Sequence, residues 1–157
     1  MEIQVSERGW LFAEMESLIV ELLRGLAACA DPDDEASRRR IFSSPTGGAD
    51  AKADREWREE IEPEMRELFQ SHVDVVAADV AAIQQEGDSF ALAIPAKNAR
   101  AWIHTLNQAR LALGARHGVT DDDTAGRRRP RGPKAFAIMQ IDFYGMLLSA
   151  LLEHTEL

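Results

Sequence analysis

The chain has 157 residues, the length of one domain, with 45% hydrophobic and 29% charged residues. This composition is that of a folded globular protein and excludes a largely disordered chain. The formal net charge of -9 opposes sequence-independent binding to nucleic acid and to anionic membrane surfaces. We therefore expect residues 1–157 to form a single acidic domain.

The start of the chain and its one cysteine bear on its cellular location. The first ten residues, MEIQVSERGW, predict no signal peptide, because no apolar run follows a basic segment. Cys29 is the single cysteine, which excludes an internal disulfide and fits a reducing cytoplasm. The most apolar segment, Phe136 to Leu152, is short for a bilayer and contains Gln140 and Asp142. We expect a cytoplasmic protein that does not enter the membrane.

The first forty residues predict a short strand and two helices. Glu2–Val5 alternates polar and apolar side chains, as a strand does. From Trp10 to Ala30 the apolar residues recur at about 100° per residue, which predicts a helix. Asp31 and Pro32 are then typical of the cap and first residue of a short helix that continues through Phe42.

A long helical pattern follows from about Asp54 to Gln85. Pro63 lies inside it, which predicts either a kink or a junction of two helices near Glu62. The segment Phe90–Ile94 is typical of extended chain. We expect it to pair with Glu2–Val5 as a two-stranded ribbon that packs on the helices.

The last third of the chain predicts two more helices. Pro95 suits the first position of a helix that runs to His117, with Gly118 as the glycine that ends it. Residues 119–133 predict an exposed loop that begins with a turn capped by Thr120 and Asp123.

The final helix is expected from about Lys134 to Glu153 and is apolar almost all round. Such a helix either lies at the centre of its own domain or is shared with a second chain, and we expect a homodimer. The predicted fold is therefore mainly α, a compact bundle of about five helices with the small two-stranded ribbon.

A few polar residues occupy the apolar faces of the two longest helices. His72 and Asp79 lie on the apolar face of the helix after Pro63, and Arg110 lies on that of the next helix, with Asn107 at its edge and His117 two turns beyond Arg110. Since a buried charge without a partner is costly, Asp79 and Arg110 are predicted to face each other. These five residues form either a structural ion-pair cluster or a ligand-binding polar site between the helices, and the structural interpretation is favoured.

The motifs of catalysis and metal binding are missing from the sequence. No Glu-x-x-His pair, nucleophile elbow or glycine-rich phosphate loop occurs, and His104 and His117 lie on different faces of one helix. Cys29 falls in an apolar stripe, as a core residue does. We expect no catalytic residues, no metal and no cofactor.

The strongest charge cluster is the basic run in the predicted loop before the last helix. Its members are Arg127, Arg128, Arg129, Arg131 and Lys134. The run has no interleaved aromatic residues and directly follows three aspartates, so we expect a solvated loop and do not expect nucleic-acid binding. The alternative is that this basic run contacts an acidic protein partner.

The predicted fourth helix and the residues after it contain the most distinctive string of the sequence, which comprises Trp102, Ile103, Leu106, Asn107, Arg110, Leu111, Leu113, Gly114, Gly118, Val119, Thr120, Asp122 and Asp123. This string resembles a bacterial family catalogued as domain of unknown function number two thousand and seventeen. The order of the other predicted elements is also similar to that of the family, so the resemblance covers nearly the whole chain.

The resemblance implies a small helical cytoplasmic protein with no established enzymatic activity. Some relatives, the AosR-type proteins, are redox-responsive regulators that partner a sigma factor and rely on paired cysteines. Cys29 is alone in this chain, which excludes an intramolecular thiol switch here. Asn107 and Arg110 are the motif positions that also stand out from the residue pattern.

Three hypotheses for the function follow. The first is a non-catalytic interaction or regulatory module, most simply a homodimer with an unidentified protein partner. The second is a small-ligand binder or enzyme that uses the polar residues between the helices. The third is a transcriptional regulator that touches nucleic acid through residues 127–134.

Overall fold

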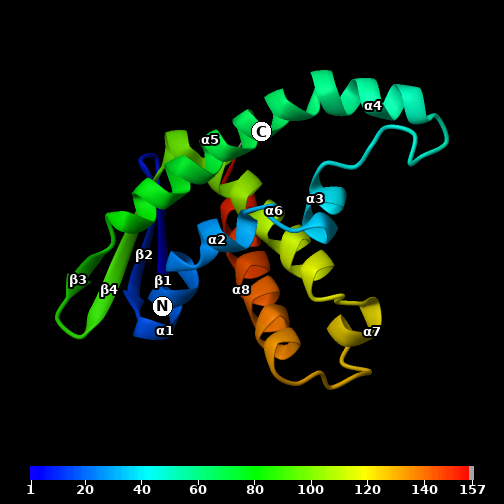
Figure 1. The fold of residues 1–157 in the computed structure, drawn as a ribbon. Helices are drawn as coiled ribbons and strands as arrows, with labels where there is room; N and C mark the ends of the chain where they lie inside the picture. Colours follow the sequence, from blue (N-terminus) through cyan, green and yellow to red (C-terminus); the bar gives the residue numbers. More distant parts are fainter. Residues whose placement is uncertain (156–157) are drawn as a thin grey trace.

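A four-stranded antiparallel sheet forms one layer of the protein in the computed structural model, which describes residues 1–155 (Figure 1). The spatial order is β1-β2-β4-β3. The strands are β1 (Glu2–Ser6), β2 (Gly9–Met15), β3 (Gln84–Glu86) and β4 (Ser89–Pro95). Side chains alternate across it: Trp10 and Leu92 are buried against the helices, whereas Leu11 and Ala93 are exposed. The protein is therefore an α+β fold, and the expected helical bundle with a two-stranded ribbon is wrong in this respect.

The sequence prediction missed two strands, β2 and β3. Gln84–Glu86 forms β3, so the helix that was expected to continue to Gln85 ends at Ala81. Glu2–Ser6 pairs with β2, and β2 in turn pairs with β4, so the predicted direct pairing of Glu2–Val5 with Phe90–Ile94 does not occur. A register shift between Phe12 and Met15 turns both side chains toward the core. This bulge gives the apolar residues a helix-like spacing, which is why the segment from Trp10 was assigned to a helix.

The helical layer begins at Ser17 and covers the inner face of the sheet. Its first three helices are α1 (Ser17–Arg24), α2 (Leu26–Ala30) and α3 (Glu35–Ile41). The cap of α3 is Asp34, whose carboxylate accepts a 2.8 Å hydrogen bond from the Ser37 amide, and not Asp31 as expected. The predicted short helix after Pro32 thus exists but begins three residues later.

The predicted junction near Glu62 is confirmed. Helix α4 (Ala51–Glu60) is followed by α5 (Glu62–Ala81), with Pro63 in the first turn of α5, where its missing amide costs nothing. Helix α4 extends away from the rest of the molecule (Figure 1). Its start is fixed by Asp54, whose carboxylate accepts hydrogen bonds from the amides of Thr46 and Gly48.

The remaining helices follow the expectations closely. A 3-10 turn, η1 (Ala96–Asn98), separates Pro95 from α6 (Ala99–Arg116), so Pro95 ends β4 and does not open the helix. Gly118 has a φ of 59° and ends α6 as predicted. The capping box of Thr120 and Asp123 forms α7 (Asp121–Thr124), and α8 spans Pro133–Glu153.

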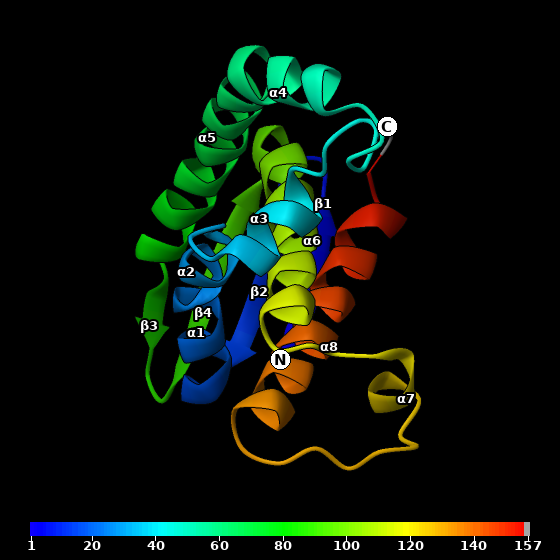
Figure 2. The same ribbon diagram turned by 45° about the vertical axis from the view of Figure 1, so that its right-hand side comes forward.

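The core lies where α6 and α8 pack against each other and against the inner face of the sheet (Figure 2). Trp102 and Leu106 of α6 and Tyr144 and Leu151 of α8 are fully buried. The Tyr144 hydroxyl donates a 2.7 Å hydrogen bond to the carbonyl oxygen of Leu22 in α1. Helix α8 is therefore part of the core of its own domain on one side.

Candidate functional site

Asp79 joins the last turn of α5 to the start of α6. Its carboxylate accepts hydrogen bonds of 3.1 and 2.9 Å from Asn98 Nδ2 and one of 2.8 Å from Trp102 Nε1. The half-buried carboxylate thus has hydrogen-bond partners, as burial requires, but the expected pairing with Arg110 does not form. Arg110 lies two turns beyond Trp102, so it is too far along α6 to meet Asp79.

His72 stacks on His104 across the contact of α5 with α6. The ring centroids are 4.8 Å apart and the planes are inclined by 3°. Burial lowers the pKa of His72, and the neighbouring His104 and Arg100 lower it further. The two rings thus form a stacked π contact between the helices. Among residues 1–155 no group of three or more His, Cys, Asp or Glu side chains could hold a metal ion.

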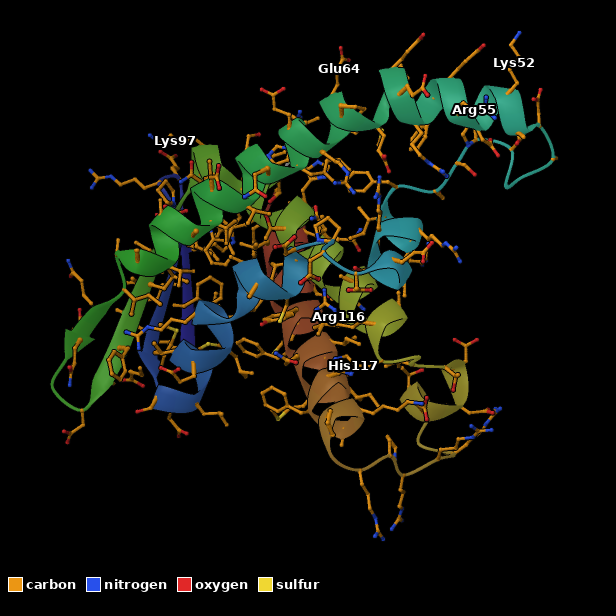
Figure 3. All side chains as sticks on the ribbon, in the orientation of Figure 1. Lys52, Arg55, Glu64, Lys97, Arg116 and His117 are labelled. Atoms are coloured by element: carbon orange, nitrogen blue, oxygen red, sulfur yellow. The ribbon has the colours of Figure 1, made fainter. Side chains whose placement is uncertain are left out.

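The other predicted cluster residues lie apart from this contact. Asn107 is exposed, and His117 is the half-exposed residue that follows the last turn of α6 (Figure 3). Arg110 leans against α8: a Cβ atom on Gly145 would lie 3.2 Å from Arg110 Nε. The structure therefore does not bring the five residues together in one site, and ligand binding by them stays a prediction.

Arg116 makes a network that the sequence patterns did not reveal. Its Nε donates to Asp34 Oδ2 at 2.7 Å, and its Nη2 donates to the carbonyl oxygen of Asp31 at 2.9 Å (Figure 3). The pKa of Asp34 is held far below its usual range by hydrogen bonds from Ser37 and by Arg116. The network fixes α3 to α6. The acidic cap of α3 was visible in the sequence, but its partner was not.

Cys29 is buried beside polar groups of α8. Gln140 Nε2 lies 3.4 Å and the Tyr144 hydroxyl 3.9 Å from its sulfur atom. Burial raises the pKa of the thiol, which disfavours the nucleophilic thiolate. The position matches the expected role as a core residue.

The outward side of α8 carries apolar residues that are open to solvent, of which Phe143 also packs partly against the core. The most exposed of them are Phe136 (50%), Met139 (39%) and Met146 (47%). Two more are half-exposed: Phe143, between Met139 and Met146, and Ala150, one turn after Met146. We call these five residues the α8 stripe. By length and mean hydropathy alone α8 could cross a membrane, yet Tyr144 and Leu151 on its opposite side are fully buried in the domain.

A groove of about 810 Å³ separates α3 from the junction of α4 and α5. Its floor is formed by Phe42 and Phe69, with the Arg66 guanidinium 5.3 Å above the Phe42 ring. Among the charges on its walls, Arg38 pairs with the buried Glu62 at 3.1 Å, whereas the buried Nε of Arg66 has no acceptor in residues 1–155. The groove thus holds both paired and unpaired charges.

The basic run is partly held by ion pairs with two of the three aspartates before it. Arg127 contacts Asp122 at 3.2 Å, and Lys134 contacts the buried Asp123 at 2.9 Å. Lys134 and the capping hydrogen bonds of Thr120 lower the pKa of Asp123 to about 2. The other three arginines, Arg128, Arg129 and Arg131, are exposed.

The model of a family described as Domain of unknown function (DUF2017) matches residues 6–155. The chain belongs to the DUF2017 family. No curated protein and no solved structure matches it.

In this DUF2017 protein the residues that carried the resemblance have identifiable structural roles. Trp102 is fully buried and donates to Asp79, Gly118 ends α6, and Thr120 with Asp123 caps α7. Two polar members of the string, Asn107 and Arg110, have side chains that make no hydrogen bond or ion pair in residues 1–155, and of the two Asn107 is exposed. Arg110 is therefore the half-buried motif residue whose role the fold alone does not explain.

Proposed function

We propose that this DUF2017 protein is a non-catalytic interaction module that pairs with a second copy of itself through the α8 stripe. The observation that carries the proposal is the exposed apolar side of a helix whose other side is a core element. Contiguous apolar surface of this kind is costly in water and is typical of protein–protein contacts.

The spacing of the α8 stripe fits a helical partner. Its members Phe136, Met139, Phe143, Met146 and Ala150 follow one another at intervals of three, four, three and four residues. This is the repeat with which one helix packs its side chains between those of another along a shared seam. A partner helix laid along α8 would therefore cover all five residues.

The stripe is also self-complementary about its centre. In an antiparallel pair centred on Phe143, Phe136 of each copy faces Ala150 of the other, so a large side chain meets a small one. Met139 then faces Met146. A closed two-fold contact requires a surface that matches itself in this way. The proposal therefore commits to a second copy as the occupant.

The titratable groups support a role without catalysis. Asp79, Asp34 and Asp123 are engaged in hydrogen bonds that fix helix ends, and the pKa of the buried Cys29 thiol is raised. Activated catalytic groups instead sit in a cleft with a free proton or electron pair to use. These three carboxylates are occupied in building the fold.

The proposal is tested by placing charge in the stripe. A variant with Met139→Glu and Met146→Glu is expected to elute as a monomer, because paired carboxylates at a closed seam are desolvated and repel. The matched control is Leu68→Glu on α5, which is 54% exposed and outside the stripe. Light scattering after size exclusion gives the mass of each. Equal masses for the variant, the control and the unchanged protein would refute the stripe as the contact.

A further inference from the structure

A cavity of about 510 Å³ opens beside the second half of α6, away from the α8 stripe. Arg40 from the end of α3 and Arg110 from α6 contribute its charges, and Gly114 and Gly118 form part of its wall. No Asp or Glu of residues 1–155 lines it. The cavity is therefore positively charged in a protein whose net charge is -9.

Neither arginine in this cavity is paired within the described chain. Arg40 is exposed and makes no ion pair in residues 1–155. Arg110 is half-buried, and its Nε is fully buried with no acceptor. The contrast with Arg116 on the same helix is informative, because Arg116 is equally half-buried and binds two aspartates and a carbonyl oxygen. A half-buried guanidinium left without an acceptor gains from an added anion.

Gly145 of α8 holds the guanidinium in this position. A Cβ atom at position 145 would lie 3.2 Å from Nε and 3.3 Å from Cζ of Arg110, closer than ordinary contact. Glycine in a helix interior costs up to about 1 kcal/mol relative to alanine. The missing side chain at position 145 leaves the space in which the Arg110 guanidinium lies against α8.

The wall of the cavity leaves room for an anion close to the arginines. A side chain on Gly114 or Gly118 would meet no heavy atom within 4 Å, so the cavity is open at both positions. The hydroxyl of Thr120 is already bonded to Asp123, whose charge is balanced by Lys134. The two guanidinium groups are thus the free hydrogen-bond donors of the site.

We infer that Arg110 and Arg40 form a binding site for the oxyanion group of a small molecule, a phosphate or a carboxylate. The planar guanidinium fork matches the two oxygens of either group and binds them with paired hydrogen bonds. Arg110, positioned by Gly145, supplies the main contact with the anion. Arg40, at the end of α3, supplies the second. This inference is independent of pairing through the α8 stripe.

The site is tested by titrating the full chain at constant ionic strength and following backbone amide resonances. Inorganic phosphate and acetate are the two probes, and chloride replaces them in the reference titration. Saturable shifts are expected at Gly114, Gly118 and Thr120, with a dissociation constant on the order of 1 mM. Saturation by phosphate alone identifies a phosphate group as the ligand chemistry, and saturation by acetate alone identifies a carboxylate.

Two variants and one control separate a built site from general ion effects. Arg110→Gln and, with its charge unchanged, Gly145→Ala are both expected to weaken binding about tenfold or more. Arg55→Gln on the outer part of α4 is the control and leaves binding unchanged (Figure 3). The inference is overturned if neither probe saturates, or if Arg110→Gln and Arg55→Gln bind alike.

Discussion

Asp79 holds the start of α6 against α5 through three hydrogen bonds, one of them from the buried Trp102. The apolar surroundings of Asp79 in the sequence correctly predicted that it needs a partner. The predicted partner, Arg110, is wrong. A helical plot shows which face of a helix a residue occupies, but not which residues of the neighbouring helix lie at the same position along the axis. Asn98 and Trp102 were both visible in the sequence, yet only the crossing of the two helices selects them.

Removal of the Asp79 carboxylate tests its structural role. Asp79→Ala leaves Trp102 Nε1 buried without an acceptor and is expected to lower the free energy of unfolding by about 2 kcal/mol. Asp74→Ala is the control, since Asp74 is exposed on the same helix and binds only Gln70. Urea unfolding followed by circular dichroism measures both. An unchanged midpoint for Asp79→Ala would contradict the assignment.

His72 makes stability depend on pH. Its pKa in the folded chain is lowered from 6.5, so the unfolded chain binds this proton more readily and acidification favours unfolding. His72→Gln removes that contribution. When the pH falls from about 7 to about 5, the free energy of unfolding of this variant is expected to decrease less than that of the unchanged protein.

The control for this prediction is His154→Gln, because His154 is exposed at the end of α8. Its loss of stability on acidification should equal that of the unchanged protein. Urea midpoints at the two pH values measure the effect. If His72→Gln and His154→Gln respond to acid alike, the stacked pair does not control the pH dependence.

Among the helices and strands, the parts that the sequence predicted well have local signals. Pro63 marks the junction of α4 and α5, Gly118 ends α6, and the pair Thr120 and Asp123 caps α7. Strand β2 has no such signal, because the bulge before Met15 gives its apolar residues a helix-like spacing. Its place between β1 and β4 is set by long-range pairing, which a single sequence does not display.

Gly9 begins β2 and lies against β4. Its φ of 131° disfavours any other residue, and an added Cβ would overlap the carbonyl oxygen of Ile94. Gly9→Ala is therefore expected to lower the free energy of unfolding by at least about 3 kcal/mol.

Gly47→Ala is the control for this substitution, because Gly47 has a φ of 62° but nothing lies within 4 Å of its added Cβ. It carries the conformational cost alone, about 1 kcal/mol. Urea unfolding of the two variants separates the cost of the backbone conformation, which both share, from the steric clash with Ile94, which only Gly9→Ala has. Equal losses would mean that β4 moves away from Gly9 without cost.

For the protein as a whole, the sequence predicted a second copy from the apolar character of the last helix, and the structure divides that helix into a buried side and the α8 stripe. Composition alone could not make this division, because both sides are apolar. It depends on how α6 and the sheet cover α8. The free Arg110 could not be predicted either, since its isolation follows from the position of Gly145.

The antiparallel arrangement about Phe143 is open to a direct test by cross-linking. A chain with Met139→Cys and Met146→Cys is expected to form a disulfide-linked dimer on mild oxidation, because the two positions face each other across the seam at a distance that a disulfide spans. The native Cys29 is buried and does not compete. Leu68→Cys, which is exposed on α5, should stay unlinked under the same conditions. Linking in the control to the same extent would contradict the arrangement.

The mass of the unchanged protein in solution tests the proposed pairing most directly. One chain has a mass of 17.4 kDa. Sedimentation equilibrium over a range of concentrations is expected to give a particle of twice 17.4 kDa that dissociates only on dilution. A particle of 17.4 kDa at every concentration would contradict the α8 stripe as a contact between two copies.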